Sequence, residues 1–143
     1  MKGKFKLIKV FSKIHGNVFR VSGGRIWNRF KNIEFILLTT VGSKSGKKRT
    51  VPLVAIPFNG SYILIASFGG NDTHPAWFIN IMYNSEVSIR IESVVKNAKA
   101  SIIEKSDSRY EDMWAKAVEV YPGYDEYKKA TTRHIPIVVI SLV

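Results

Sequence analysis

The sequence predicts a mainly β, α+β fold, in which about six strands form a small antiparallel barrel with flanking helices. Short β-prone runs recur along the chain, and the hairpin signal Asn59-Gly60 joins two of them directly. Strict alternation of strands and helices, which would indicate a parallel sheet, is missing. Residues 1–143 contain no linker, repeat or low-complexity tract, so a single domain is expected.

The first expected element is an amphipathic basic helix at about residues 5–21, where the apolar side chains and the Lys and Arg side chains fall on separate arcs. Its apolar face could pack on the domain core or lie on an anionic membrane. Strands are then expected at residues 34–40, 51–58, 62–67, 87–92, 98–104 and 135–142. Pro52 and Pro57 place the second of these strands at a sheet edge or near a bulge.

Two further helices are expected between these strands. One covers residues 75–84, because Pro75 suits the first turn of a helix. The other begins at Ser108, where Glu111 completes the spacing of a capping box, and ends at the Pro122-Gly123 break. The helices therefore lie at the N-terminus, in the middle of the chain and before the last strand.

Positive charge is concentrated in the first third of the chain. The net charge is +11, and residues 1–49 contain 13 Lys and Arg but only one acid, Glu34. Such asymmetry indicates a polyanionic partner, which could be nucleic acid, an anionic membrane or a phosphorylated ligand, while a solvated basic face is the alternative. Aromatic residues are not interleaved with the basic cluster as stacking platforms, so no nucleic-acid partner is expected.

Composition excludes several kinds of chemistry. The chain has no Cys, so it has no disulfide framework, thiolate nucleophile or Cys-based metal site. His15, His74 and His134 lack the spacing of metal ligands, so no metal site is expected and redox work would need a borrowed cofactor. No apolar run reaches the roughly 20 residues of a membrane span, and no signal peptide is evident. We expect a cytoplasmic protein, with peripheral contact at the inner face of the membrane through the N-terminal helix as an option.

The first candidate site lies at residues 39–53. Two glycines bracket a tight connection between two expected strands, and four Lys or Arg side chains project from it together with hydroxyl and amide donors. This mixture is typical of phosphate and carboxylate binding. It is not a Walker A loop, because three residues instead of four separate the glycines and Lys48 follows Lys47. An exposed basic hairpin without a ligand is the alternative.

The second candidate site, at residues 66–80, combines a strand end, a glycine pair and a helix start. Gly69 and Gly70 allow the backbone to come close to a flat group. Ser67 and the helix N-terminus could face the polar edge of a ring, with Trp77 and Phe78 nearby. A turn followed by aromatic core residues is the alternative.

Three tyrosines around a helix break form the third candidate site. Tyr121, Tyr124 and Tyr127 follow one another at intervals of three, and Arg133 comes shortly after them. They could supply phenolic donors on the apolar wall of a pocket, and packed tyrosines at a helix end are the alternative.

Together these segments resemble the deazaflavin (F-420)-dependent nitroreductase and quinone reductase family, whose fold is the split β-barrel of FMN-binding proteins. The resemblance runs from about Phe35 to Ile140. Its marks are four motifs in order: T-T-x-G-x-K-S-G-x-x-R-x-x-P-L at residues 39–53, A-S-x-G-G at 66–70, P-A-W-F-x-N at 75–80, and Y-P-x-Y-x-x-Y…T-x-R-x-I-P at 121–136. Each motif alone is weak, whereas the four in this order are specific.

The resemblance implies a role for each motif. The basic turn would hold the phosphate and oligoglutamate tail of the cofactor, and the second segment would hold the deazaflavin ring. The implied cofactor-binding residues are Lys44, Ser45, Lys48, Arg49, Pro52, Ala66, Ser67, Phe68, Gly69, Gly70, Pro75, Ala76 and Trp77. The implied catalytic residues are Ser67, Tyr121, Tyr124 and Tyr127. Val54 and Phe68 differ from the residues common in the family, near the place where the acceptor would lie.

The implied activity is hydride transfer from reduced F-420 to a quinone, nitro or enone acceptor. Ser67 and the backbone at Gly69 and Gly70 are the candidate donors to the anion that forms, and Tyr124 is the first choice for returning the proton. Three alternatives remain: an FMN-binding split-barrel reductase, a basic nucleic-acid-binding barrel, and a deazaflavin carrier without turnover. The oligomeric state is left open, a dimer included.

Overall fold

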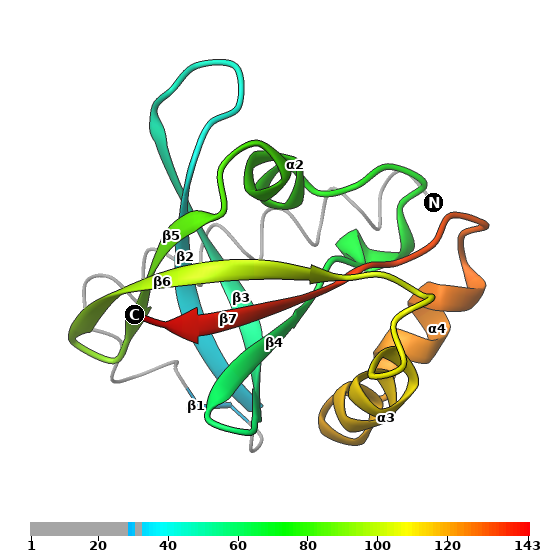
Figure 1. Ribbon diagram of the computed structural model, residues 1–143. Coiled ribbons are helices and arrows are strands. Elements are labelled where there is room, and N and C mark those ends of the chain that lie inside the picture. The colour runs from blue at the N-terminus through cyan, green and yellow to red at the C-terminus, as the bar shows by residue number, and fades with distance from the viewer. Residues whose placement is uncertain (1–28, 31–32) are drawn as a thin grey trace.

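The computed structural model describes residues 29–30 and 33–143, and a closed six-stranded barrel forms its centre (Figure 1). The barrel strands are β2 (Ile33–Val41), β3 (Lys48–Phe58), β4 (Ser61–Ile65), β5 (Glu86–Ile91), β6 (Val94–Ile103) and β7 (Ile137–Leu142). They pair antiparallel in the order β2-β3-β4-β7-β6-β5, and a β2–β5 pairing closes the ring. The short strand β1 (Arg29–Phe30) pairs with β2. The expected antiparallel barrel is therefore confirmed.

The helix expected at residues 5–21 lies outside the described residues. Its position, and the organisation of all 143 residues as one domain, stay predictions. Among the helices that the structure does describe, none has the length and apolar character needed to cross a membrane.

Two apolar clusters hold the fold together. The first draws residues from all six barrel strands and from helix α2 (Ala76–Tyr83), so it fills the barrel interior. The second lies between the strands and the helices α3 (Tyr110–Val120) and α4 (Gly123–Lys129). Ile56, Ile63 and Ile137 are fully buried in it. Each such side chain contributes about 1.5–3 kcal/mol by leaving water.

The prolines and the hairpin signal in β3 behave as their sequence context predicts. Register places Pro52 opposite Leu37 of β2, whereas Pro57 lies opposite Tyr62 of β4. At each of these positions β3 has a partner strand on one side only, so each proline lies at a locally unpaired edge of the strand. Asn59 and Gly60 both have positive φ, 48° and 79°, as a two-residue type I′ turn requires.

The break expected at Pro122-Gly123 is present, but a further helix, α4, begins at Gly123 itself. Two local expectations were wrong. Helix α3 begins at Tyr110 without a side-chain cap from Ser108, because Asp107 accepts hydrogen bonds from the amide and the guanidinium of Arg109 instead. Strand β6 begins at Val94, because pairing with β5 extends the strand into residues that are exposed and carry no alternating pattern.

The fold places the candidate segments in a continuous series. The β2–β3 connection extends beyond the barrel beside α2, and α3 and α4 lie together on another side of the molecule (Figure 1). Between α2 and β4 runs the short helix η1 (Phe68–Gly70), which contacts α4. The basic turn, α2, η1 and α4 are thus linked in space as well as along the chain.

Candidate active site

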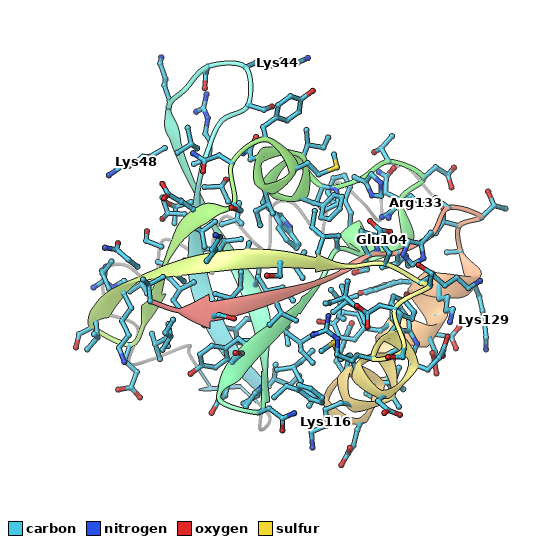
Figure 2. The ribbon with its side chains drawn as sticks, in the orientation of Figure 1. Lys44, Lys48, Glu104, Lys116, Lys129 and Arg133 are labelled. Atoms are coloured by element: carbon cyan, nitrogen blue, oxygen red, sulfur yellow. The ribbon has the colours of Figure 1, made fainter. Side chains whose placement is uncertain are left out.

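The first candidate segment forms a basic turn, residues 42–49, which joins β2 to β3 and includes the first two residues of β3. Hydrogen bonds from Gly42 N to Lys47 O (2.8 Å) and from Gly46 N to Gly42 O (2.9 Å) close the turn. Lys44 and Lys48 point away from the barrel in Figure 2. In the described part of the chain, none of the turn's cations forms an ion pair with an acid. The positive charge of this turn is therefore available to an anionic ligand.

Asn80 of α2 anchors the basic turn to the barrel. Its side chain is 6% exposed, its Nδ2 donates to Thr40 Oγ1 (2.9 Å), and its Oδ1 accepts from Ser43 N (2.9 Å). The sequence analysis included Asn80 in the motif at residues 75–80 but predicted no structural role for it. The available signal was a lone amide within an otherwise apolar helix, because a buried amide has to find hydrogen-bond partners.

The second candidate segment forms a glycine turn, residues 66–71, with an uncommon backbone conformation. Phe68, Gly69 and Gly70 have positive φ values of 45°, 64° and 82°. Gly70 N donates to Ser67 O (2.9 Å), so the Gly70 amide is engaged within the turn. Among the described residues, no backbone carbonyl accepts from the amides of Ser67 and Gly69. These two amides therefore lack a backbone acceptor, although both residues are buried.

Helix α2 begins beside the glycine turn. The Pro75 carbonyl accepts from Phe78 N (3.1 Å) and Ile79 N (3.3 Å), which starts the helix at Ala76. Ala76 is exposed, whereas Trp77 is 7% exposed and packs edge-on against Phe78 within the barrel cluster. Trp77 therefore has mainly a core role, and Ala76 is the accessible residue at this helix start.

The third candidate segment forms a tyrosine cluster, made of Tyr121, Tyr124 and Tyr127. The three ring centroids lie 5.0, 6.0 and 6.4 Å apart, and the hydroxyls of Tyr121 and Tyr127 are 3.0 Å from each other. Tyr124 is 5% exposed, whereas the other two are half-buried. Burial raises the pKa of Tyr124, and burial together with its hydrogen bond to Tyr121 raises the pKa of Tyr127.

Gly70 brings the glycine turn against the tyrosine cluster. A Cβ added at Gly70 would lie 3.0 Å from the carbonyl oxygen of Tyr127 and 2.9 Å from Cβ of Ala130. The turn and α4 are thus in direct contact, through the backbone of Tyr127 and the side chain of Ala130. Pro52 lies within β3, beyond the basic turn, and Val54 belongs to the periphery of the cluster under α3 and α4.

The barrel, the basic turn and the glycine turn define the class of split-barrel proteins that hold a flavin-like cofactor. Residues 11–141 of this chain match the family described as F420H(2)-dependent quinone reductase. This chain belongs to that family, so it is an oxidoreductase that uses the deazaflavin coenzyme F420. The resemblance inferred from the four motifs is confirmed.

Individual relatives agree with the family assignment. The F420H(2)-dependent quinone reductase Rv1261c of Mycobacterium tuberculosis is 29% identical over 131 residues, which cover 90% of this chain and 88% of that protein. A solved F420-H2-dependent reductase, FDR-A, shares 41% identity and a TM-score of 0.67, covering 75% of this chain and 93% of its own. A structure described as a domain-swapped dimer shares 34% identity and a TM-score of 0.70 over 90% of this chain and 96% of its own.

The described residues fit such a cofactor. The unpaired cations of the basic turn suit a phosphate and carboxylate tail, and the two available amides of the glycine turn suit the polar edge of a ring. The hydrogen bonds of Asn80 attach the basic turn to α2, the helix that begins beside the glycine turn. An elongated ligand with an anionic end and a flat end matches this arrangement.

Proposed function

We propose that this chain transfers a hydride from reduced F420 to a quinone acceptor, with nitro compounds and enones as further acceptors. In this proposal the tail lies on the basic turn at Lys44, Ser45, Lys48 and Arg49, the ring lies on the glycine turn and the start of α2, and the acceptor lies against the tyrosine cluster. The observation that supports it is the contact of Gly70 with the backbone of Tyr127, because it joins the glycine turn to the helix that carries Tyr124 and Tyr127.

The chain's own residues then have separable tasks. Bound F420 supplies the hydride from carbon-5 of its reduced ring. The Ser67 hydroxyl and the amides of Ser67 and Gly69 donate hydrogen bonds to negative charge that develops at the site. The tyrosine cluster provides an apolar wall that orients the acceptor and excludes water.

Proton return is assigned to the hydroxyl pair of Tyr121 and Tyr127. Tyr124 was the first choice from sequence, and its role stays a prediction. Its burial makes it the least accessible of the three, however, whereas the half-buried pair can pass a proton between two hydroxyls 3.0 Å apart. We therefore favour the pair as the proton source.

Replacement of Tyr127 by Phe tests this assignment. The substitution removes one hydroxyl and keeps the ring, so we expect kcat for quinone reduction to fall by about 100-fold while the affinity for F420 stays unchanged. Steady-state kinetics at saturating F420H2, together with a fluorescence titration of F420, would measure both quantities. Tyr62→Phe, which alters a half-buried tyrosine of β4, is the matched control. An unchanged kcat in Tyr127→Phe and Tyr121→Phe would assign proton return to solvent.

Arg49→Ala tests the placement of the cofactor tail. Loss of a charge-assisted hydrogen bond should weaken F420 binding by about 1–3 kcal/mol. A deazaflavin fragment that lacks the phosphate tail should bind wild type and variant equally, because it never reaches the basic turn. Lys99→Ala removes the same charge from an exposed position of β6 and should leave both affinities unchanged. Equal F420 affinity in Arg49→Ala and wild type would move the tail to another surface.

Wild-type titrations separate the proposed cofactor from the alternatives. Tight FMN binding without F420 binding would contradict the proposal, and F420 binding without oxidation of F420H2 by menadione would indicate a carrier. Steep salt dependence of binding to generic DNA would be the mark of a nucleic-acid-binding barrel.

We infer further that the enzyme forms a dimer, since one relative is described as a domain-swapped dimer. The cytoplasmic location expected from the sequence stays a prediction. Sedimentation velocity of the purified chain would test the dimer. Sedimentation with anionic vesicles would test the peripheral membrane contact expected from the basic first third of the sequence.

A further inference from the structure

Arg133 lies in the loop between α4 and β7, behind the glycine turn, and uses all of its hydrogen-bond donors. A guanidinium has five N–H donors in a rigid fork. Nε donates to Asn71 O (2.8 Å), and Nη2 donates to Ala66 O (3.1 Å) and Ser67 O (2.9 Å). Nη1 donates to His134 O (3.2 Å) and to Nδ1 of His74 (3.1 Å). Three of the five acceptors are carbonyls of the glycine turn.

The acceptors of Arg133 are all neutral. No carboxylate forms an ion pair with it in the described part of the chain, and the nearby Asp72 accepts instead from the Thr131 hydroxyl (2.8 Å). Burial lowers the pKa of Arg133, and the guanidinium stays charged because its ordinary pKa is so high. Arg133 therefore acts through the geometry of its fork and not through pairing with an acid.

The glycine turn needs such a support. Phe68 has a left-handed backbone conformation, which costs a residue with a side chain about 1–2 kcal/mol, and Gly69 and Gly70 continue the same conformation. Strained conformations persist where the surrounding structure imposes them. The guanidinium of Arg133 donates hydrogen bonds to the carbonyls on both sides of residues 68–70. These are the carbonyls of Ala66 and Ser67 before them and of Asn71 after them.

The same fork reaches the start of α2 through His74. Arg133 can only donate, so Nδ1 of His74 accepts and its proton lies on Nε2. Burial and the adjacent Arg133 lower the pKa of His74, which keeps the imidazole neutral near pH 7. The His74 ring packs on Phe78 with centroids 4.8 Å apart. Arg133 thus connects the glycine turn with the residues that open α2.

We propose that Arg133 is the positioning residue of the deazaflavin-ring segment. By holding the carbonyls of Ala66, Ser67 and Asn71, it sets the glycine turn so that the amides of Ser67 and Gly69 remain available to the ring. This inference rests on the proposed placement of the ring. It gives Arg133 the task of holding the segment that binds the cofactor ring, without contact between Arg133 and the quinone.

Arg133→Ala and Arg133→Lys test the proposal with two ligands, F420 and the deazaflavin fragment that lacks the tail. A residue that positions the ring segment affects both ligands, so we expect both affinities to fall by about tenfold or more in Arg133→Ala. Methylguanidinium added to Arg133→Ala should restore most of the loss, because it can refill the fork. Arg133→Lys carries the charge on a single nitrogen that cannot span the three carbonyls, so it should lose about as much as Arg133→Ala. Arg109→Ala, which removes an exposed arginine bound to Asp107, is the control.

The outcomes distinguish this inference from the proposed function. One outcome is that both Arg133 variants keep wild-type affinity for both ligands, while Arg49→Ala binds F420 more weakly and the fragment normally. That outcome supports the tail placement and overturns the Arg133 proposal. If the Arg133 variants and substitutions at Gly70 all leave the fragment's affinity unchanged, the ring lies elsewhere and the proposed site fails with it. Should Arg133→Ala not fold, Arg133→Lys decides: full fragment affinity in that variant overturns the proposal. His74→Asn, which keeps an acceptor near the Nδ1 position, should bind the fragment better than His74→Leu.

Discussion

Replacement of Gly70 by Ala is expected to displace α4 from the glycine turn. The new Cβ would lie 2.9 Å from Cβ of Ala130 and 3.0 Å from the carbonyl oxygen of Tyr127, and the backbone neighbour cannot move as a flexible side chain could. The residue also has a φ of +82°, which alanine tolerates poorly. We expect the free energy of unfolding to fall by about 3 kcal/mol or more from strain and overpacking together.

The same change should also impair catalysis. Gly70 is the contact between the ring segment and the tyrosine cluster, so a shift of about 1 Å there would misalign donor and acceptor and lower kcat/KM by about 100-fold. Denaturant unfolding and quinone-reduction kinetics would measure the two effects. Gly60→Ala is the matched control, because Gly60 has a similar φ of +79° but open space around its Cβ position. It should lose about 1–2 kcal/mol of stability and keep full activity. Equal behaviour of the two variants would show that backbone strain alone matters at Gly70.

Replacement of Asn80 by Leu is expected to release the basic turn. Asn80 is buried between Thr40 and Ser43, so the substitution leaves the Thr40 hydroxyl and the Ser43 amide without their partner. An unsatisfied buried group costs about 1–3 kcal/mol, and the half-buried Ser43 amide adds less than the buried Thr40 hydroxyl, so we expect the free energy of unfolding to fall by about 2–4 kcal/mol. The turn would also lose its fixed position, and F420 should bind at least about tenfold more weakly.

Asn84→Ala provides the control for this second prediction. Asn84 lies at the other end of α2, where its Oδ1 accepts from the exposed Glu86 amide (3.0 Å), so water can replace it. Asn84→Ala should therefore lower the free energy of unfolding by less than about 1 kcal/mol. Calorimetry would give the stabilities, and titration with F420 and the tail-free fragment would give the affinities. If Asn80→Leu weakens the fragment as much as F420, the tether acts on the ring segment and our account of the basic turn is wrong.

Much of the barrel was predictable because its signals are local. The alternation of apolar residues in β5, the Asn59-Gly60 turn and the prolines of β3 each restrict the backbone within a few residues. The start of β6 was not predictable in this way. Val94 and Val95 are 51% and 64% exposed, and they are strand residues because β5 pairs with them, not because a pattern requires it.

The candidate site was predictable in its parts and not in its assembly. The residue types of the basic turn, the glycine turn and the tyrosine cluster indicate by themselves which ligand groups they could bind. A residue that only holds other residues in place gives no such indication in the sequence. Arg133 looked like the end of a motif, and only the fold shows that its fork joins residues more than 60 positions away. The same guanidinium donates to the imidazole of His74 and to the backbone carbonyl of His134, two residues that are distant in sequence.

The sequence by itself determined the class of fold, the family and the cofactor, because strand patterning and four ordered motifs are properties of the linear chain. The tertiary structure decided which groups remain available to a ligand. The Gly70 amide is engaged within its own turn, Tyr124 is buried, and Trp77 serves the core. These distinctions depend on burial and on hydrogen-bond partners, and both are set by contacts between segments far apart in the chain.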